Sequence, residues 1–355
     1  MNLLIITMSP GETSQFIALA KELIDKKHKI FFGYLKNVNP IILNALECEK
    51  QLINSPEQAR DLINSGIYQA VMLGNSKIFR NSQQFQNKKP DSAPFCVSLD
   101  SNWLFNQPES FPFIKWLDII YLNFPEDVYK NGLVEYGGSY HIPDEIKKKI
   151  KTVGLIPSYK PISDSAKKET REKLGIKEDE KLIFCYIGSG NGYTLRHEFR
   201  PILIEIFNQY WQNNRKFKII YMSGEEPVGA PWLVPTGGQA DSKIFFEYLS
   251  ASDLVFQHQG MGTLQQSISA CVPAIANVPP VDPNKDHNTA WEIGPFEKAG
   301  LCKMHFYDDK IDKIISSVND LLYTDSGNLM RRIQKDHYSY GEENLCSDLL
   351  RRISK

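Results

Sequence analysis

Two glycine-rich turns in the second half of the sequence have residue types that suit phosphate binding. The first turn, 188–192, reads GSGNG; it follows the apolar run 182–187 and precedes a helical pattern with Phe199 and Leu203 on one side. Free backbone N–H groups and the positive end of a helix favour a bound anion at such a turn. The alternative is a tight strand-to-helix turn that needs glycine only for its backbone dihedral angles.

The second turn, 258–263, reads HQGMGT and comes directly after another apolar run. Gly260 and Gly262 allow the backbone to close on a diphosphate, and the Thr263 hydroxyl adds a donor. The His258 ring can donate an N–H to a phosphate oxygen, and the alternative is a structural role, which is commoner for a lone histidine. Because open α/β sheets bind ligands at the carboxyl ends of their strands, the two turns predict one diphosphate site.

Short apolar runs alternate with amphipathic segments along the chain, a pattern typical of parallel strands covered by helices on both faces. The first strand and helix are separated by the turn Ser9-Pro10-Gly11. The sequence therefore predicts the α/β fold class. The expected strands are 3–7, 29–34, 70–73, 95–99, 119–122, 182–187, 218–222, 254–257 and 274–278.

The chain has 355 residues, 42% of them hydrophobic and 23% charged, which makes it too long for one ordinary core and too apolar for disorder. The stretch GLIPSYKPISDSAKKE at 154–169 interrupts any periodic pattern. We therefore predict a first domain at 1–155, a linker at 156–165, a second domain at 166–330, and a C-terminal helical segment at 331–355 that caps either domain.

Charge and cysteine content exclude several classes of protein. A net charge of -1 supplies no field for gripping nucleic acid, so no nucleic-acid partner is expected. The six cysteines form no CxxC pair and are expected to be reduced thiols. The N-terminus lacks the basic start of a signal peptide, and no apolar stretch approaches the roughly 18 residues of a membrane span. We expect a cytoplasmic protein, with peripheral contact at the inner face of the membrane as the alternative.

The second half of the chain resembles the nucleotide-sugar glycosyltransferases of the GT-B fold. HQGMGTLQQSISACVPAIANVP at 258–279 has the spacing of their donor-site signature. The next stretch, DHNTAWEIGPFEKAGL at 286–301, is similar to the family that adds N-acetylglucosamine to a lipid-linked muramyl peptide. The resemblance covers most of 182–302 and little of the first half. It implies two facing Rossmann-like domains with parallel sheets and a deep cleft between them.

The resemblance also implies which residues hold the donor, a UDP-sugar. Gln266 stands where the family has a glutamate that accepts from the ribose hydroxyls, so the chain keeps an acceptor oxygen there but loses its charge. The segment 222–224 either lies near the base or is a plain surface loop. The implied diphosphate residues are Gly188, Ser189, Gly190, Asn191, His258, Gly260, Met261, Gly262 and Thr263; those for ribose and base are Gln266, Met222, Ser223 and Gly224; those for the sugar are Asp286, His287 and Asn288.

The first half of the chain supplies candidates for the general base that deprotonates the acceptor hydroxyl. The loop SPGET at 9–13 resembles the family's first loop, with Glu12 in place of a histidine. A carboxylate does this work if burial raises its pKa, and the alternative is a charge that stabilises a helix N-terminus. Asp100 is the second candidate base, or else a turn residue that bonds its own backbone. The residues expected to contact the acceptor are Gly11, Thr13 and Asn102.

Aromatic and aliphatic residues crowd the segments 103–105 and 111–117 near the candidate acceptor loop. They either form core or, if exposed, line a greasy acceptor site or touch a membrane. The histidines show no metal-ligand spacing and no Asp-x-Asp motif occurs, so neither a metal nor another cofactor is predicted. The helix ends and His258 would then stabilise the leaving group.

Together these features predict a metal-independent, inverting glycosyltransferase that moves a hexose from a UDP-sugar to an acceptor hydroxyl. The acceptor is not identified; it is a glycan, a lipid-linked compound or a small molecule. Two alternatives remain open. One is a non-catalytic protein that binds a sugar nucleotide or activates a partner, and the other is a nucleotide-sugar epimerase of the same fold.

Overall fold

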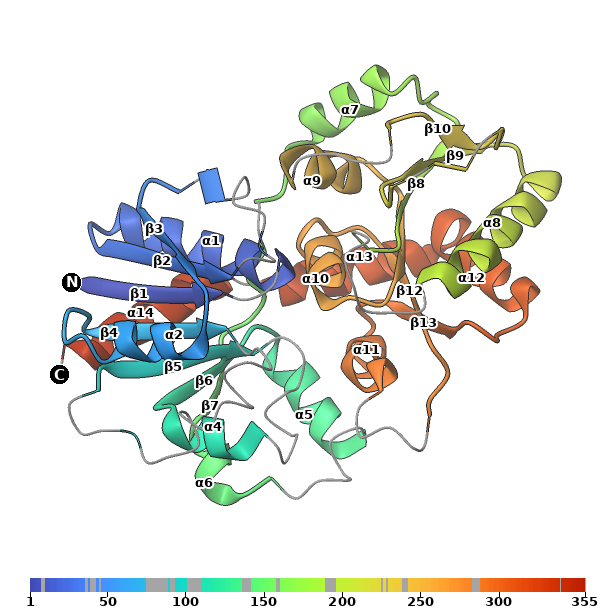
Figure 1. The fold of residues 1–355 in the computed structure, drawn as a ribbon. Coiled ribbons are helices and arrows are strands. Elements are labelled where there is room, and N and C mark those ends of the chain that lie inside the picture. The colour runs from blue at the N-terminus through green and yellow to red at the C-terminus, as the bar shows by residue number, and fades with distance from the viewer. Residues whose placement is uncertain are drawn as a thin grey trace. The chain divides into compact units, whose positions relative to one another are not determined.

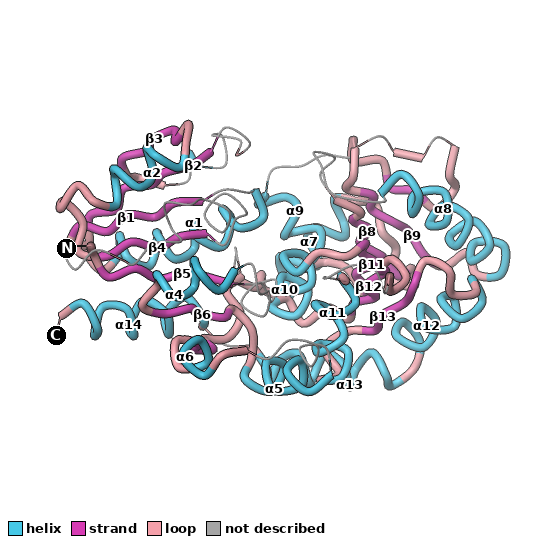
Figure 2. Tube along the Cα trace, turned by 60° about the horizontal axis from the view of Figure 1, so that its bottom comes forward, coloured by secondary structure: helices cyan, strands magenta, loops and turns pink. Residues whose placement is uncertain are grey.

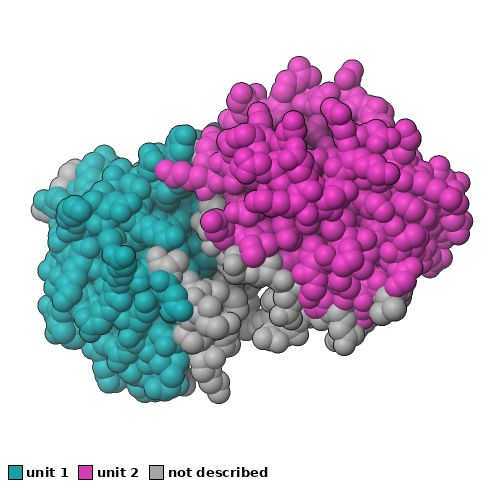
Figure 3. Space-filling view, turned by 90° about the horizontal axis from the view of Figure 1, so that it is seen from above, with its two compact units in different colours: residues 1–158, 339–355 teal, residues 159–338 magenta. Residues whose placement is uncertain are grey.

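The computed structural model divides the chain into two compact units, Met1–Ser158 with Ser339–Lys355, and Tyr159–Tyr338 (Figures 1 and 3). The second unit is therefore inserted into the sequence of the first. The structure describes residues 1–7, 10–35, 38, 43–44, 46–74, 89, 93–100, 110–135, 142–157, 160–188, 196–224, 226–227, 229–237, 242–282, 288–338 and 340–354.

The first unit is built on a seven-stranded sheet in which every pair of neighbours is parallel. The strands are β1 (Asn2–Thr7), β2 (Lys29–Leu35), β3 (Glu49–Ile53), β4 (Ala70–Gly74), β5 (Phe95–Asp100), β6 (Ile119–Leu122) and β7 (Ile150–Thr152). Their order in the sheet is β3-β2-β1-β4-β5-β6-β7. The central strands are continuous apolar runs with buried side chains on both faces, as a parallel sheet covered on both sides requires.

Helices complete the first unit and cover its sheet (Figures 1 and 2). They are α1 (Pro10–Asp25), α2 (Pro56–Ile63), α4 (Phe111–Trp116), α5 (Glu126–Glu135), α6 (Asp144–Lys147) and α14 (Gly341–Ile353). Phe16, Leu19 and Leu23 of α1 pack on Leu3 and Ile5 of β1 in one buried core. The amphipathic spacing of α1 thus positions the first turn of this helix at the carboxyl edge of the sheet, where Glu12 reaches Gly74.

The C-terminal helix α14 belongs to the first unit, although it comes last in the chain. Its Leu345 and Leu349 are fully buried in the same core. Asp348 lies beside them, and burial alone would raise its pKa. Hydrogen bonds outweigh that effect and hold the Asp348 pKa well below its usual value; their donors are Lys151, Arg352, Arg351 and Tyr121. This carboxylate joins α14 to Lys151 of β7 at 2.7 Å and to Tyr121 of β6 at 2.9 Å.

The second unit contains a six-stranded parallel sheet in the order β10-β9-β8-β11-β12-β13. Its strands are β8 (Lys181–Tyr186), β9 (Phe217–Tyr221), β10 (Leu233–Val234), β11 (Leu254–His258), β12 (Ala274–Val278) and β13 (Lys303–Phe306). Its helices are α7 (Asp164–Lys173), α8 (Arg196–Asn213), α9 (Ser242–Ser250), α10 (Met261–Ser269), α11 (Thr289–Lys298), α12 (Ile311–Tyr323) and α13 (Asp325–His337).

One face of this second sheet forms a large aromatic core with α8 and α12. Leu254 and Phe256 of β11 point into it, together with Phe199 and Phe207 of α8 and Ile314 of α12. Side chains on a strand alternate between its faces, so His258, two residues after Phe256, points to the same side. The core therefore decides where the histidine of the second glycine turn lies.

The predicted α/β fold with two parallel, Rossmann-like sheets is confirmed. Each predicted strand overlaps an observed one. The strands that the pattern did not predict are β3, β7, β10 and β13, all of them short or rich in exposed side chains. They lie at or near sheet edges, where one side of the strand needs no apolar cover.

The apolar segment 111–117 is core and not an exposed surface. Phe113, Ile114, Trp116 and Leu117 are each at most 4% exposed, so the alternative of a greasy acceptor site or membrane contact is wrong for these side chains. The segment 103–105 lies outside the described residues. Within the described ranges, no helix is both long and apolar enough to cross a membrane.

Candidate functional site

The two glycine turns open from neighbouring strands of the second sheet. β8 and β11 pair in parallel, with Tyr186 opposite Gln257, so both strands end at the same edge. Gly188 and Gly260 follow these paired residues closely. Because adjacent strands lie about 4.8 Å apart, the structure brings the starts of both predicted turns together. Both glycines have positive φ, 100° at Gly188 and 125° at Gly260, a conformation that other residues rarely adopt.

Helix α10 begins immediately after Gly260 and presents its N-terminus at this edge. The first backbone N–H that bonds back along the helix is that of Leu264, which donates to the Gly260 carbonyl at 3.3 Å. The N–H groups of Met261, Gly262 and Thr263 precede it and have no acceptor within the helix. A Cβ built at Gly262 meets no atom within 4 Å, so open space lies beside this turn. These features suit an anion such as a diphosphate.

His258, at the end of β11, is only 3% exposed. Its ring lies against two aromatic rings, with centroid distances of 5.7 Å to Phe199 and 5.6 Å to Tyr307. Burial lowers the pKa of His258 to about 4, so the ring is neutral at physiological pH. A neutral ring donates a single N–H, and it brings no positive charge to the turn before a ligand arrives.

Behind His258 lies a group of polar side chains that the sequence analysis did not single out. Asn277 of β12 pairs directly with His258 in the sheet, and its amide donates to the Gln257 carbonyl at 3.0 Å. Three buried atoms here, His258 Nε2, Asn277 Oδ1 and Tyr307 Oη, have no hydrogen-bond partner among the described residues. The sequence contains a sign of this group, because Asn277 is the one polar residue in the apolar run 274–278.

The loop after β9 is fixed by polar contacts at the same edge. The Ser223 hydroxyl accepts a hydrogen bond from the Ile187 N–H at 2.7 Å, which ties this loop to the end of β8. Ser223 and Met222 are both 4% exposed, and Gly224 has a φ of 86°. The carboxylate of Glu226 accepts from the Thr236 N–H at 2.7 Å and closes the loop further along. A role of 222–224 beside the base stays a prediction.

Of the residues predicted to contact the ribose and the sugar, the structure describes Gln266 and Asn288. Gln266 is partly exposed on α10. Asn288 holds its own loop together, since its Oδ1 accepts from the Asp282 N–H at 2.8 Å and its Nδ2 donates to the Asp282 carbonyl at 3.1 Å. Thr289 donates to the Gln259 side chain at 2.7 Å and so links α11 to the second turn. The predicted site residues outside the described part are Ser189, Gly190, Asn191, Asp286, His287 and Asn102.

The first unit brings both candidate bases to the carboxyl edge of its own sheet. Glu12 lies in the first turn of α1, which also contains Gly11, and its carboxylate reaches the end of β4 at Gly74. Gly74 pairs with Leu99 of β5, and Asp100 is the next residue and fully buried. The predicted acceptor contact Thr13 is also fully buried.

The Thr13 hydroxyl donates to the Thr7 hydroxyl at 2.9 Å and thereby joins α1 to β1. The two candidate carboxylates come from α1 and β5 and approach the same edge of the sheet. Within the residues described, no three His, Cys, Asp or Glu side chains are grouped as a metal site would need. A role of Glu12 or Asp100 as the general base stays a prediction.

Comparison with solved structures agrees with the GT-B fold. Matches over nearly the whole chain include MurG of Acinetobacter baumannii (11% identity, TM-score 0.58, 100% of this chain and 99% of that one). They also include the glycosyltransferase SnogD from Streptomyces nogalater (12%, 0.63, 99% and 99%). A putative UDP-N-acetylglucosamine 2-epimerase from Listeria monocytogenes matches as well (15%, 0.63, 97% and 93%). No protein-family model and no curated protein sequence matches the chain. The chain thus has the GT-B fold at low sequence identity.

Proposed function

We propose that this protein transfers a hexose from a UDP-sugar to an acceptor hydroxyl, with inversion and without a metal ion. The observation that carries the proposal is the pair of glycine turns at the ends of adjacent strands β8 and β11. One of them starts a helix, and open space lies beside Gly262 in the first turn of that helix. A pyrophosphate is the group whose charge and size this arrangement accommodates.

In the proposed reaction the acceptor oxygen attacks the anomeric carbon as the bond to the diphosphate breaks. Negative charge then develops on the leaving diphosphate. The N–H groups of Met261, Gly262 and Thr263 and the positive end of α10 are fixed before the reaction, so they stabilise that charge without reorganising. A single displacement inverts the configuration of the sugar, and the proton of the acceptor hydroxyl passes to Glu12 or Asp100.

Binding of the nucleotide tests the donor site directly. We expect UDP and UDP-sugars to raise the melting temperature, whereas GDP and dTDP raise it less. A ligand that binds only the folded protein at about 100 times its Kd stabilises it by about 2.7 kcal/mol. The proposal fails if none of the three nucleotides, alone or as a sugar conjugate, shifts the melting temperature.

A matched pair of variants separates this site from unspecific charge effects. Gly262→Glu places a carboxylate in the open space beside α10, where we expect it to repel the diphosphate and abolish the UDP-induced shift. Ser316→Glu adds the same charge at an exposed position of α12 and should leave the shift unchanged. Equal UDP shifts in the two variants would place the nucleotide elsewhere.

Epimerisation is the second candidate function, because an epimerase of UDP-N-acetylglucosamine is among the proteins with this fold. An epimerase needs no acceptor. Incubation with a UDP-sugar alone, followed by proton NMR, would reveal a second epimer if this alternative holds. Tight UDP-sugar binding with neither an epimer nor transfer to a broad panel of acceptors would instead support a non-catalytic binding protein.

A further inference from the structure

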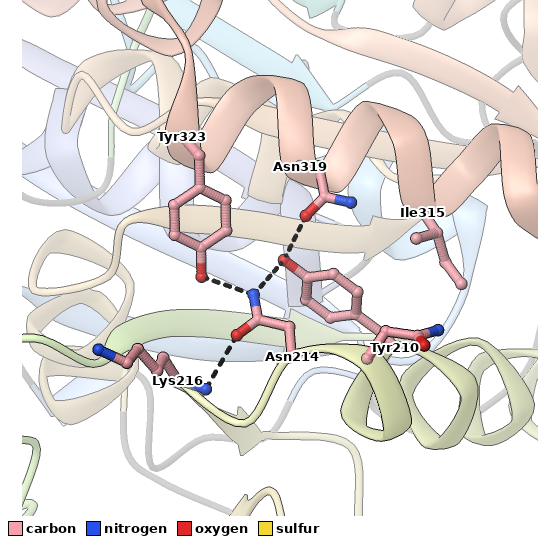
Figure 4. A pocket seen from close by; sticks show the side chains of 7 residues that line it. Tyr210, Asn214, Lys216, Ile315, Asn319 and Tyr323 are labelled. Carbon is pink, nitrogen blue, oxygen red and sulfur yellow. Dashed lines mark hydrogen bonds between the residues drawn. The ribbon is translucent and has the colours of Figure 1, made fainter.

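A surface pocket of about 420 Å³, lined by polar and aromatic residues, lies in the second unit between the end of α8 and α12 (Figure 4). Its wall includes Tyr210, Asn214 and Lys216 from the end of α8 and the connection to β9. Asn319 and Tyr323 of α12 face them. The volume falls within the range of about 300–1,000 Å³ that is typical of small-molecule sites.

The pocket is remote from the donor turns. β8 and β9 start at the pocket end of the sheet and finish at the edge where Gly188 and Ser223 lie. Helix α8 ends at the pocket and has 18 residues, which gives a length of about 27 Å. An occupant of this pocket is therefore a different molecule, or a different part of a molecule, from the proposed donor.

Hydrogen bonds hold the floor of the pocket in one arrangement (Figure 4). The Asn214 amide donates to the Tyr210 and Tyr323 hydroxyls at 3.1 and 2.9 Å. The Tyr210 hydroxyl donates to Asn319 Oδ1 at 2.9 Å, and the Lys216 N–H donates to Asn214 Oδ1 at 2.9 Å. Tyr210 is 1% exposed and so cannot swing away. Groups fixed in this way lose little entropy when a ligand binds.

Some bonding capacity is left for a ligand. The two N–H groups of Asn319 Nδ2 and the side-chain oxygen Oδ1 of Asn213 have no hydrogen-bond partner among the described side chains and backbone. Tyr323 is 47% exposed and lines the pocket with its ring. The site thus combines a donor pair, an acceptor and an aromatic surface.

The lining excludes other ligand classes. Ile315 is the sole aliphatic side chain in it, which disfavours a lipid, and none of the lining residues is acidic, which disfavours a metal ion. The Lys216 ammonium pairs at 3.2 Å with Asp179, which is not a lining residue, and the other lining residues offer a phosphate no positive charge. A pyranose has an apolar C–H face for a phenol ring and hydroxyls for planar amides, and it needs no charge.

We propose that this pocket binds one hexopyranose unit of a neutral oligosaccharide, at a site separate from the donor turns. Such a site would anchor a glycan by a unit that does not react and so raise its local concentration near the protein. The inference stands on the pocket alone and does not require the donor site to bind UDP.

Saturation-transfer NMR with maltose, cellobiose and N,N′-diacetylchitobiose tests the proposal on the full-length protein. We expect at least one of these disaccharides to receive saturation, most strongly at the ring C–H protons of one unit, and to do so equally with excess UDP present. The absence of transfer to all three, or its loss when UDP is added, would overturn the separate site.

Three variants locate the binding. Tyr323→Ala removes the exposed ring and should weaken the disaccharide at least fivefold. Asn319→Asp keeps the acceptor oxygen for Tyr210 but removes both free N–H groups, so it should also weaken disaccharide binding. Leu329→Ala removes an equally exposed side chain, 51% exposed, on α13 of the same unit and should change nothing. Unchanged affinity in Tyr323→Ala would show that the sugar binds elsewhere, while the melting temperatures check that the variants fold.

Discussion

The carboxylate of Glu12 lies against the Cα of Gly74, in the space that the Cβ of any other residue at position 74 would occupy. The contact joins the first turn of α1 to the end of β4, and the strand beside β4 ends in Asp100. A Cβ at position 74 would therefore displace the Glu12 carboxylate, which is the far end of a flexible side chain and a candidate general base. The pair offers a direct way to ask what the Glu12 carboxylate does.

We expect Gly74→Ala to displace the Glu12 carboxylate and to destabilise the protein by about 1 kcal/mol, the low end for overpacking, because the end of a flexible side chain can move. In a Glu12→Ala background the added methyl group finds room, so the same substitution should then cost much less. Urea unfolding of the two single variants and the double variant gives the coupling energy between the positions. Additive effects would mean that a Cβ at position 74 does not meet the Glu12 carboxylate.

Replacing the catalytic base should slow sugar transfer without weakening the binding of the UDP-sugar donor. If Glu12 is the base, Glu12→Gln lowers kcat by about 10²–10⁴-fold while UDP affinity stays unchanged. If Asp100 is the base, Asp100→Asn has that effect, and its similar volume limits the disturbance at this fully buried position. Single-turnover rates for both variants decide between them. Wild-type rates in both would remove the base from this edge of the sheet.

His258 should make the folded protein lose stability as the solution becomes acidic. Its pKa is about 4 in the folded state and near 6.5 in an unfolded chain, so the unfolded state binds the proton first as pH falls. The stability contributed by the neutral ring is present above pH 6.5 and is lost progressively between about 6.5 and 4. Unfolding free energies measured across this interval should show the slope, and His258→Gln should lack that part of it. An identical slope in the variant would contradict the assignment.

Asp348 should contribute substantially to the stability of the first unit. Removing its charge in Asp348→Asn leaves Lys151 and two arginines without their common partner. We expect a loss of about 2 kcal/mol, less than for a fully buried pair because the cations are partly exposed. Asp164→Asn, which breaks an exposed i,i+3 pair with Lys167, serves as the control and should lose almost nothing. Thermal unfolding with the two units resolved by calorimetry would test this, and equal losses in both variants would refute it.

Much of the fold is predictable because its central strands are apolar runs between turns. The run 254–257 predicts β11 correctly. A strand that is covered on both faces is apolar on both faces, so it appears in the sequence as a continuous apolar run. β3 was missed for the opposite reason: Glu49, Lys50 and Gln51 are exposed, and only pairing with β2 makes the segment a strand. Such a strand is specified by its neighbour in the sheet and not by its own composition.

The candidate site divides in a similar way. Gly260 is predictable because a strand-to-helix turn with positive φ demands glycine. The surroundings of His258 cannot be predicted from the sequence. Phe199 and Tyr307 are far from it along the chain and meet its ring only after the sheet and α8 have packed. The contact of Glu12 with Gly74 has the same origin. Local sequence specifies backbone geometry, whereas burial and side-chain neighbours depend on the assembled core.

The position of α14 has a consequence for synthesis of the protein. Residues 159–338 form one compact unit, and the helix that completes the other unit is encoded after them. As the chain emerges from the ribosome, the later unit is complete while the earlier one still lacks Leu345, Leu349 and the carboxylate that Tyr121 bonds. The half that is translated first must therefore be the half that matures last.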